Sequence, residues 1–226
     1  MKPVGILGGM GPEATILLMQ KVLGAVDAQD DADHIPLIVH QNSQVPSRIR
    51  VLIEGTGEDP GPALAQMARD LQAAGAVALA MPCNTAHHYA PAVRAATDLP
   101  FLHMIDLTAS HLAAGGARRI GMLASPATRL ASVFDAPFAA QGLEPVWTGD
   151  EAAMLTLIRA VKAGGRPAEL SPKLAALAEG LLAQGADHLL IACTELSLMQ
   201  DALPHYVPAT DSLDCLVDAV VSAARA

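Results

Sequence analysis

Residues 75–85 read Gly-Ala-Val-Ala-Leu-Ala-Met-Pro-Cys-Asn-Thr, and residues 185–195 read Gly-Ala-Asp-His-Leu-Leu-Ile-Ala-Cys-Thr-Glu. The two stretches are copies of one pattern, in which glycine, alanine, leucine and cysteine recur at matching positions, so that Cys83 corresponds to Cys193. Each copy is an apolar run that ends in polar residues, as expected for a buried strand followed by a loop. The repeat predicts two related halves that face each other across a cleft, with one sulfur on each wall.

Strand-like and helix-like segments alternate on both sides of these copies. The predicted strands are residues 4–7, 36–40, 77–81, 101–105, 120–124, 145–147 and 189–192. Strands that alternate with helices indicate parallel sheets with right-handed crossovers. We therefore predict an α/β fold of two similar domains, each a small parallel sheet flanked by helices, related by a pseudo-two-fold duplication with the active site in the cleft between them. The predicted division is residues 1–105 plus 211–226 for the first domain and 106–210 for the second.

The loops after the strands are the predicted positions of functional side chains. In parallel α/β sheets ligands bind beyond the carboxyl ends of the strands, where both Cys83 and Cys193 occur. Asn84 is expected to cap a helix there, and Asp106 and Asp211 read as helix caps at equivalent points of the two halves. A helix N-terminus next to each thiol would lower its pKa.

Composition excludes several classes of protein. The 226 residues are 52% hydrophobic but only 3% aromatic, which suits an aliphatic α/β interior. A formal net charge of −9 argues against nucleic-acid binding, which needs a basic surface. No apolar run has spanning length, and Met-Lys-Pro-Val-Gly does not open a signal peptide. We therefore expect a cytoplasmic protein with reduced thiols and no membrane partner.

Two of the three cysteines are candidates for chemistry. Intracellular cysteines are most often buried structural residues, and Cys215, on the apolar face of the terminal helix, fits that interpretation. Two cysteines in register within a duplication favour a functional interpretation for Cys83 and Cys193. There is no Cys-x-x-Cys motif, and the adjacent His87 and His88 would point in different directions on a helix, so we expect no metal site.

Three other features remain ambiguous from their local sequence. Gly8-Gly9-Met10-Gly11 is either a tight strand-to-helix turn or a set of backbone amides open to a small anion, and it is not a nucleotide-binding loop. Arg48, alone in a loop, reads as a surface charge, and Lys162 reads as a helix end that complements the dipole.

Three stretches nevertheless resemble the signatures of a known family: residues 5–15, Gly-Ile-Leu-Gly-Gly-Met-Gly-Pro-Glu-Ala-Thr; residues 81–87, Met-Pro-Cys-Asn-Thr-Ala-His; and residues 192–197, Ala-Cys-Thr-Glu-Leu-Ser. They are similar to the aspartate/glutamate racemase family, a group of cofactor-independent amino-acid racemases, over nearly the whole chain. The resemblance implies racemisation without a cofactor, in which Cys83 and Cys193 are the catalytic base and acid on opposite faces of the substrate.

The same resemblance implies the substrate-binding residues. Arg48 would bind the distal carboxylate of aspartate or glutamate, and Lys162 is the family's basic residue near the cleft. The remaining predicted substrate-binding residues are Met10, Asn84, Thr85, Ser125, Thr128 and Thr194. The turn Ser125-Pro-Ala-Thr128 departs from the family's usual Thr-x-x-Thr, and this position borders the second-domain half of the cleft.

Two alternatives remain open at this point. One is another cysteine-based isomerase or racemase of the same superfamily, such as a hydantoin racemase or a maleate isomerase, although Arg48 and Lys162 favour a dicarboxylic amino acid over a hydantoin. The other is a two-lobed binding protein without turnover, which would not need matched cysteines. We expect a homodimer whose substrate is a small molecule, a free amino acid.

Overall fold

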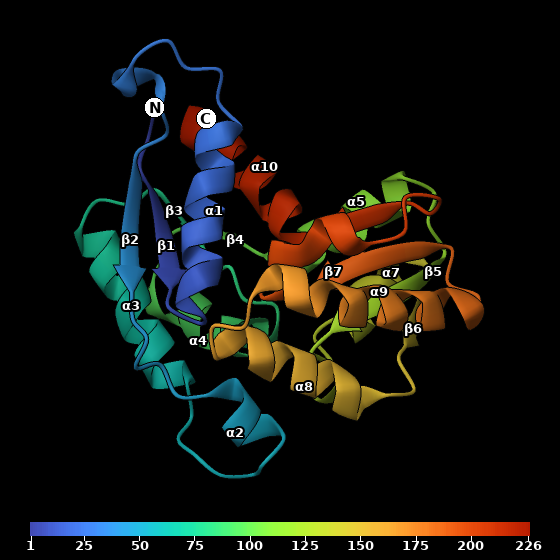
Figure 1. Cartoon of the computed structure of the whole chain (residues 1–226). Helices are drawn as coiled ribbons and strands as arrows, with labels where there is room; N and C mark the ends of the chain where they lie inside the picture. The colour runs from blue at the N-terminus through green and yellow to red at the C-terminus, as the bar shows by residue number, and fades with distance from the viewer.

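Two four-stranded parallel sheets with the same strand order form the framework of the protein (Figure 1). The computed structural model describes residues 1–226. The first sheet has the order β2-β1-β3-β4, with β1 Val4–Gly8, β2 Leu37–Gln41, β3 Ala78–Ala80 and β4 Phe101–Leu102. The second has the order β6-β5-β7-β8, with β5 Arg119–Ala124, β6 Glu144–Trp147, β7 His188–Ala192 and β8 Ala209–Asp211. This confirms the predicted α/β fold of two related parallel sheets flanked by helices.

Helices connect the strands and cover both sheets. The helices of the first part of the chain are α1 Pro12–Gly24, α2 Arg48–Leu52, α3 Gly61–Ala73, α4 Ala90–Ala96 and α5 Met104–Ala114. They are followed by α6 Pro126–Leu130, α7 Asp135–Gln141, α8 Glu151–Lys162, α9 Pro167–Ala183 and α10 Ser212–Arg225. Short 3-10 helices span Asp31–Asp33 (η1), Thr85–Tyr89 (η2) and Leu196–Ala202 (η3). None of these helices combines the length and the apolar character needed to cross a membrane.

One close contact shows how far the duplication extends. A Cβ on Gly5 of β1 would lie 2.9 Å from both Ala76 and Leu79 side-chain atoms. A Cβ on Gly121 of β5 would lie 2.9 Å from Leu189 and 3.1 Å from Ala186. Because Gly75–Thr85 and Gly185–Glu195 align, the same pair of residues crowds the same glycine in each sheet. Glycine is required at both points so that the helix-to-strand turn can pack against the neighbouring strand.

Aliphatic side chains fill the interior on both faces of each sheet. The first sheet packs against α3 on one face and against α1 and α10 on the other. The second sheet packs against α8 and α9 on one face and against α5 and α7 on the other. Burial of this apolar surface is the main stabilising contribution to a fold with so few aromatic residues.

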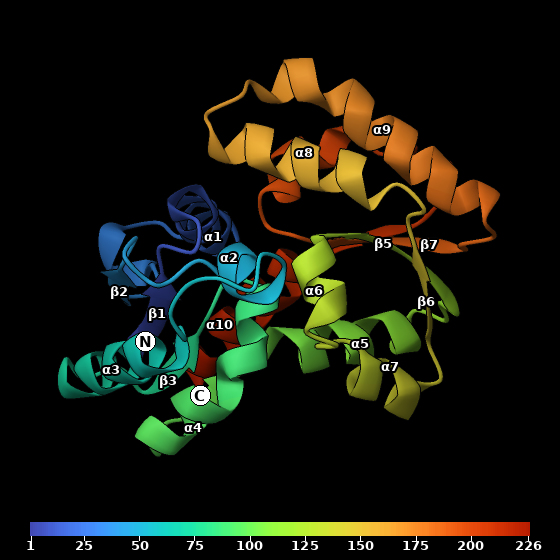
Figure 2. The same cartoon turned by 90° about the horizontal axis from the view of Figure 1, so that it is seen from below.

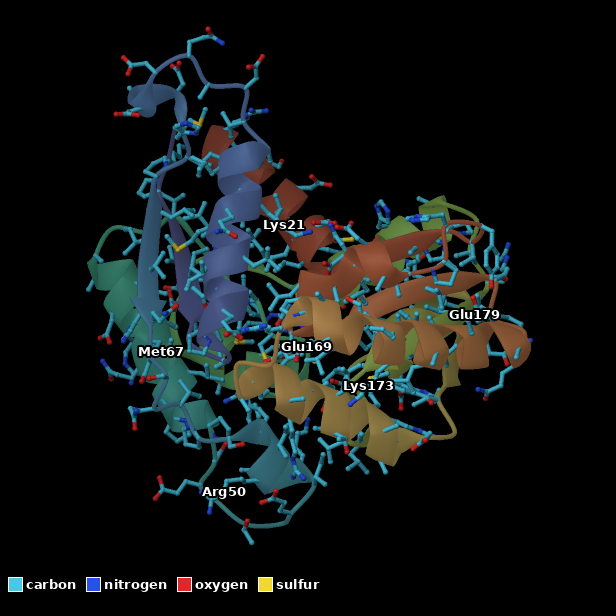
Figure 3. All side chains as sticks on the ribbon, in the orientation of Figure 1. Lys21, Arg50, Met67, Glu169, Lys173 and Glu179 are labelled. Carbon is cyan, nitrogen blue, oxygen red and sulfur yellow. The ribbon has the colours of Figure 1, made fainter.

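The C-terminal helix crosses from the second sheet to the first. It follows β8 directly, yet its apolar face packs against α1 and α5. Lys21 of α1 forms ion pairs with Asp211 and Asp214 at the start of α10 (Figure 3). The Lys21 ion pairs, and the core that α10 shares with β1 and α1, support our proposal that residues 211–226 belong with residues 1–105 in one domain and that 106–210 form the other. The contact with α5 lies across this proposed boundary.

Two of the three predicted helix caps are wrong. Helix α5 begins at Met104, and the His103 ring, which comes earlier in the chain, accepts the hydrogen bond from the Asp106 N–H at 3.4 Å. Asp106 therefore lies in the first turn and not at the cap. Asn84 makes no side-chain cap hydrogen bond, and its side-chain amide donates instead to Ser212 Oγ at 3.0 Å. Asp211 does cap α10, accepting from the Leu213 N–H at 2.9 Å.

Candidate active site

A cavity of about 400 Å³ lies between the two halves. Helices α2 and α6, one from each half, lie side by side where the halves meet (Figure 2). The cavity is lined by seven of the ten predicted site residues, namely Met10, Arg48, Cys83, Thr85, Ser125, Lys162 and Cys193. Residues from far apart in the sequence therefore line the same cavity.

The two repeat cysteines reach the cavity from equivalent loops. Cys83 follows β3, and Cys193 follows β7. They are almost equally enclosed, with exposed fractions of 8% and 7%. Because β3 and β7 occupy the same place in their sheets, the duplication delivers one thiol from each half to a single space.

A buried carboxylate accompanies only one of these thiols. The Cys193 thiol donates to Glu195 Oε2 at 3.0 Å, and Glu195 Oε1 accepts from the Lys162 ammonium. Burial, the largest single cause, would raise the pKa of Glu195, but the Lys162 charge together with the hydrogen bonds from Lys162, Cys193 and the backbone holds this pKa below its ordinary value. In turn burial would lower the pKa of Lys162, but the Glu195 charge and hydrogen bond, together with the two nearby cysteines, raise it. The pair is therefore ionised at neutral pH.

The expectation of a lowered thiol pKa is wrong for Cys193. Burial raises the pKa of this thiol well above its usual range, and the neighbouring Glu195 carboxylate raises it further. Lys162 acts in the opposite direction without reversing the shift. The helix that follows is the short 3-10 helix η3, which begins at Leu196, and its N-terminus does not outweigh burial and a carboxylate in contact with the sulfur.

Glu195 is the site residue that the sequence interpretation missed. It is 7% exposed and lines the cavity. The available signal was a difference between the two copies, because the position two residues after the cysteine is a threonine, Thr85, in the first copy and a carboxylate in the second.

Arg48 is anchored to the wall and is not the isolated surface charge that its local sequence indicates. It is the first residue of α2, and its guanidinium donates to the backbone carbonyls of Met10 and Pro46 at 3.0 Å each. Its Nε is buried and has no hydrogen-bond partner, and the residue forms no ion pair. Arg48 is thus a cation beside the cavity with an unused donor.

Two hydroxyl contacts join the halves next to the cysteines. The Thr85 and Thr128 hydroxyls are hydrogen-bonded at 2.7 Å, and Thr194 Oγ1 donates to the Pro82 carbonyl at 3.3 Å. Thr128 and Thr194 lie behind the cavity wall, as does Asn84. The structure therefore brings Thr85 to the cavity, places Thr128 and Thr194 at the junction of the two halves, and buries Asn84 against Ser212.

Ser125 and the glycine turn complete the lining. Ser125 Oγ accepts from the Ala127 N–H at 3.2 Å and caps α6. In the turn, Gly9 has a φ of 95°, and a Cβ there would lie 2.4 Å from the backbone of Asn42. The segment is therefore a tight strand-to-helix turn, which was one of its two interpretations. Gly9, Met10 and Gly11 also line the cavity.

A neutral histidine fixes the loop that carries Cys83. His87 Nδ1 donates to the Cys83 carbonyl at 2.9 Å, and Nε2 accepts from the Met104 N–H at 3.1 Å. Burial lowers the pKa of His87 to about 3, so the ring stays neutral with its hydrogen on Nδ1. No group of three or more His, Cys, Asp or Glu side chains is arranged to hold a metal ion.

Comparison with known proteins gives the family and the fold of the chain. The family described as Asp/Glu/Hydantoin racemase matches residues 7–220. The broad specificity amino-acid racemase RacX of Bacillus subtilis (strain 168) is 26% identical over 224 residues, which cover 97% of this chain and 96% of that protein. The structure of Picrophilus torridus aspartate racemase superposes with a TM-score of 0.90 at 29% identity, covering 100% of this chain and 95% of the other. A glutamate racemase from Francisella tularensis subsp. tularensis, 16% identical with a TM-score of 0.64 over 98% of this chain and 80% of the other, shares the fold.

Proposed function

The chain belongs to the Asp/Glu/hydantoin racemase family, and we propose that it interconverts the L and D forms of aspartate or glutamate by a two-base mechanism. The observation that carries this proposal is the pair of cysteines from equivalent loops on the wall of one cavity. Racemisation needs a proton acceptor on one face of the α-carbon and a proton donor on the other. A duplicated loop supplies both groups.

The proposed reaction has two proton transfers. One sulfur, as thiolate, removes the α-proton, and the opposite thiol returns a proton to the other face of the resulting carbanion. Each sulfur must approach the α-carbon to roughly 3–3.5 Å, so the substrate has to lie between Cys83 and Cys193. Hydrogen-bond donors on the cavity wall then stabilise the charge that develops on the α-carboxylate. Because the thiols are both acid and base, the proposed reaction uses neither a metal nor pyridoxal phosphate.

Arg48 is the proposed ligand of the distal carboxylate. Arg48 lines the cavity of a protein whose formal net charge is −9. An anionic substrate therefore needs a local cation, and an arginine–carboxylate contact is charge-assisted and stronger than a neutral hydrogen bond. Thr85, Ser125 and the turn around Met10 are the proposed ligands of the α-carboxylate, from their place on the wall.

Hydrogen exchange tests the proposal directly. L-aspartate and L-glutamate are incubated separately with the enzyme in deuterated water, and loss of the α-proton is followed by NMR. We expect loss of the signal together with appearance of the D enantiomer on chiral chromatography. A sample of the Cys83→Ser variant controls for a contaminating racemase. If the wild type exchanges neither amino acid, racemisation of acidic amino acids is the wrong assignment.

A second candidate is a racemase of broader amino-acid specificity. The observation in its favour is the charge balance of the cavity wall, where Arg48 and Lys162 are matched by Glu13 and Glu195. Because Lys162 is already paired with Glu195, one cation remains for a substrate with two carboxylates. The same exchange assay with alanine, methionine and lysine separates the candidates, since only a broad enzyme exchanges amino acids without an acidic side chain.

We also propose that the protein is a homodimer. Ile16, Met19 and Leu23 lie at helical spacing on α1 and are 49%, 41% and 56% exposed. Apolar side chains exposed together on one helix face favour contact with another protein surface. Light scattering with size-exclusion chromatography measures the mass, and a Met19→Lys variant should shift a dimer towards the monomer.

A further inference from the structure

The two halves of the candidate active site differ at one pair of equivalent positions. Thr85 follows Cys83 by two residues, and Glu195 follows Cys193 by two residues. The Thr85 hydroxyl is hydrogen-bonded to Thr128 in the other half, whereas the Glu195 carboxylate accepts the Cys193 thiol within its own half. The pseudo-two-fold relation therefore holds for the sulfurs and fails for their neighbours.

We propose that Glu195 makes the two cysteines chemically unequal: it holds Cys193 in the thiol form, so that Cys83 is the sulfur left to act as the thiolate in the first step. The assignment of Cys83 as first proton acceptor and Cys193 as first proton donor rests on the racemase function proposed above. The protonation states themselves are a property of this chain and can be measured without a substrate.

The contact geometry requires a proton between Cys193 and Glu195. Glu195 Oε2 lies 3.0 Å from Cys193 Sγ, and both residues are buried. An ionised carboxylate accepts hydrogen bonds and donates none, so the hydrogen in this contact belongs to the sulfur. Loss of that proton would leave two negative charges in contact away from water, which is costly in a medium of low dielectric constant.

Lys162 fixes which partner of this contact is charged. Its ammonium binds Glu195 Oε1, the oxygen that does not face the thiol. This ion pair keeps Glu195 ionised and leaves Oε2 free to accept from Cys193. The Lys162 charge also acts on both sulfurs. The carboxylate lies against only one of the two sulfurs, so Cys193 is the one that keeps its proton.

The resting state sets the order of events at the substrate. The Cys83 thiolate uses a sulfur lone pair to form an S–H bond with the α-proton, and the C–H electron pair stays on carbon. The carbanion then takes the proton from Cys193, whose S–H electron pair stays on sulfur. Cys83 is now the thiol and Cys193 the thiolate, beside Glu195. Proton exchange with solvent restores the resting pair, with no change in oxidation state.

Alkylation by iodoacetamide measures the proposed difference, because the thiolate is the reacting form. Protein without substrate is treated at pH 7.5 for increasing times, and modification of each cysteine peptide is quantified by mass spectrometry. Cys83 and Cys193 are enclosed to the same extent, so their relative rates report thiolate content. Cys215 is an internal reference, since burial raises the pKa of this thiol to about 11. We expect Cys83 to react at least about tenfold faster than Cys193, equivalent to one pKa unit.

One variant tests the role of the carboxylate directly. Glu195→Gln removes the negative charge and keeps the shape, so Cys193 should react about tenfold faster than in the wild type. The groups that face Cys193 are Glu195, Lys162 and Cys83, and only the first changes. Glu179→Gln, on the exposed surface of α9 far from the cavity (Figure 3), is the matched control and should leave all rates unchanged.

The outcomes separate this proposal from loss of structure and from the proposed function. A misfolded variant would expose Cys215 and accelerate all three cysteines, whereas the proposal requires a change at Cys193 with Cys215 unreactive. Equal rates for Cys83 and Cys193 in the wild type, or a Glu195→Gln rate at Cys193 equal to that of the wild type, overturns it. Exchange of amino-acid α-protons is measured on the same samples, so that a protein with unequal thiols and no exchange would contradict only the racemase function.

Discussion

The loops that carry Cys83 and Cys193 have the same backbone role and different surroundings. Each follows the equivalent strand of its sheet, and each places on the same cavity a cysteine residue that is only 7–8% exposed. Around Cys83 the neighbouring groups are a hydroxyl pair and a neutral histidine, and around Cys193 they are a buried ion pair. The difference teaches that duplication supplies matched geometry, while single substitutions beside each cysteine decide whether its thiol is protonated.

The largest expected effect comes from removing either sulfur. Cys83→Ser and Cys193→Ser should each lower racemisation by about 100- to 10,000-fold, the usual contribution of a positioned acid or base. A hydroxyl is a much weaker acid than a thiol, so it provides neither the base nor an effective donor. Circular dichroism checks that the fold survives, and chiral chromatography measures turnover. Full activity in either variant would show that the two halves do not share the chemistry.

Arg48 offers the next largest effect and tests whether the first half alone binds the distal carboxylate. Arg48→Ala should lower kcat/KM for aspartate or glutamate by about 30- to 5,000-fold, which corresponds to about 2–5 kcal/mol for a charge left unpaired. Arg50→Ala, an exposed arginine on the same helix α2 (Figure 3), is the control and should stay near the wild type. Loss restricted to acidic substrates supports the assignment. Wild-type kinetics on both acidic amino acids would redirect it to a neutral substrate.

The alkaline limb of the pH profile measures the inequality of the two thiols during turnover. Burial and Glu195 hold the pKa of Cys193 well above its ordinary value, so the donor remains protonated into the alkaline range. Glu195→Gln removes the second of these causes, and the pH at which kcat declines should move down by about one unit, or tenfold in proton concentration. Steady-state rates from pH 6 to 10 provide the measurement. An unchanged limb would mean that Cys193 is not the donor whose ionisation limits the rate.

His87, in the first half, is expected to make the stability of the protein depend on pH. Burial lowers its folded-state pKa to about 3 from an ordinary 6.5. Between these values the unfolded chain binds a proton that the folded protein excludes, so this residue makes the free energy of unfolding fall as pH falls, by up to about 1.4 kcal/mol per unit. Urea unfolding at pH 7 and pH 5 tests the slope against His87→Asn, which should be less stable at pH 7 and less sensitive to acid.

The smallest expected effect concerns the contact between the halves. Thr128→Val removes one hydroxyl of the Thr85–Thr128 pair and should lower the free energy of unfolding by about 1 kcal/mol. Thr85 lines the cavity, so water can satisfy the group that is left, which keeps the loss small. Urea unfolding gives the value, and a loss well above about 3 kcal/mol would mean that this hydrogen bond holds the two halves together.

The repeated pattern was sufficient to predict the architecture. Alternating strands and helices, and two aligned copies that end in cysteine, predicted two parallel sheets and the positions of both thiols at the strand ends. Such predictions succeed because hydrophobic period and strand-to-loop order are local properties of the chain. Gly5 and Gly121 extend the repeat, since each is crowded by corresponding residues of its own half.

The helix caps and the charge partners could not be predicted in the same way. Asn84 fits a cap by residue type, but its amide meets Ser212, which is distant in sequence. Arg48 looks like a surface charge until the turn at Met10 folds against it. These assignments depend on which segments meet, and the strength of a hydrogen bond or an ion pair depends on burial that sequence does not report.

The sequence by itself determined the fold, the duplication and the two candidate catalytic sulfurs, because each can be recognised from patterns within short stretches of the chain. Only the tertiary structure decided how those sulfurs differ. Lys162 on α8 meets Glu195 after β7 once the second half has folded, and this contact holds a carboxylate ionised against one thiol. The physical reason is that a pKa is set by the charges and the solvent that surround a group in space.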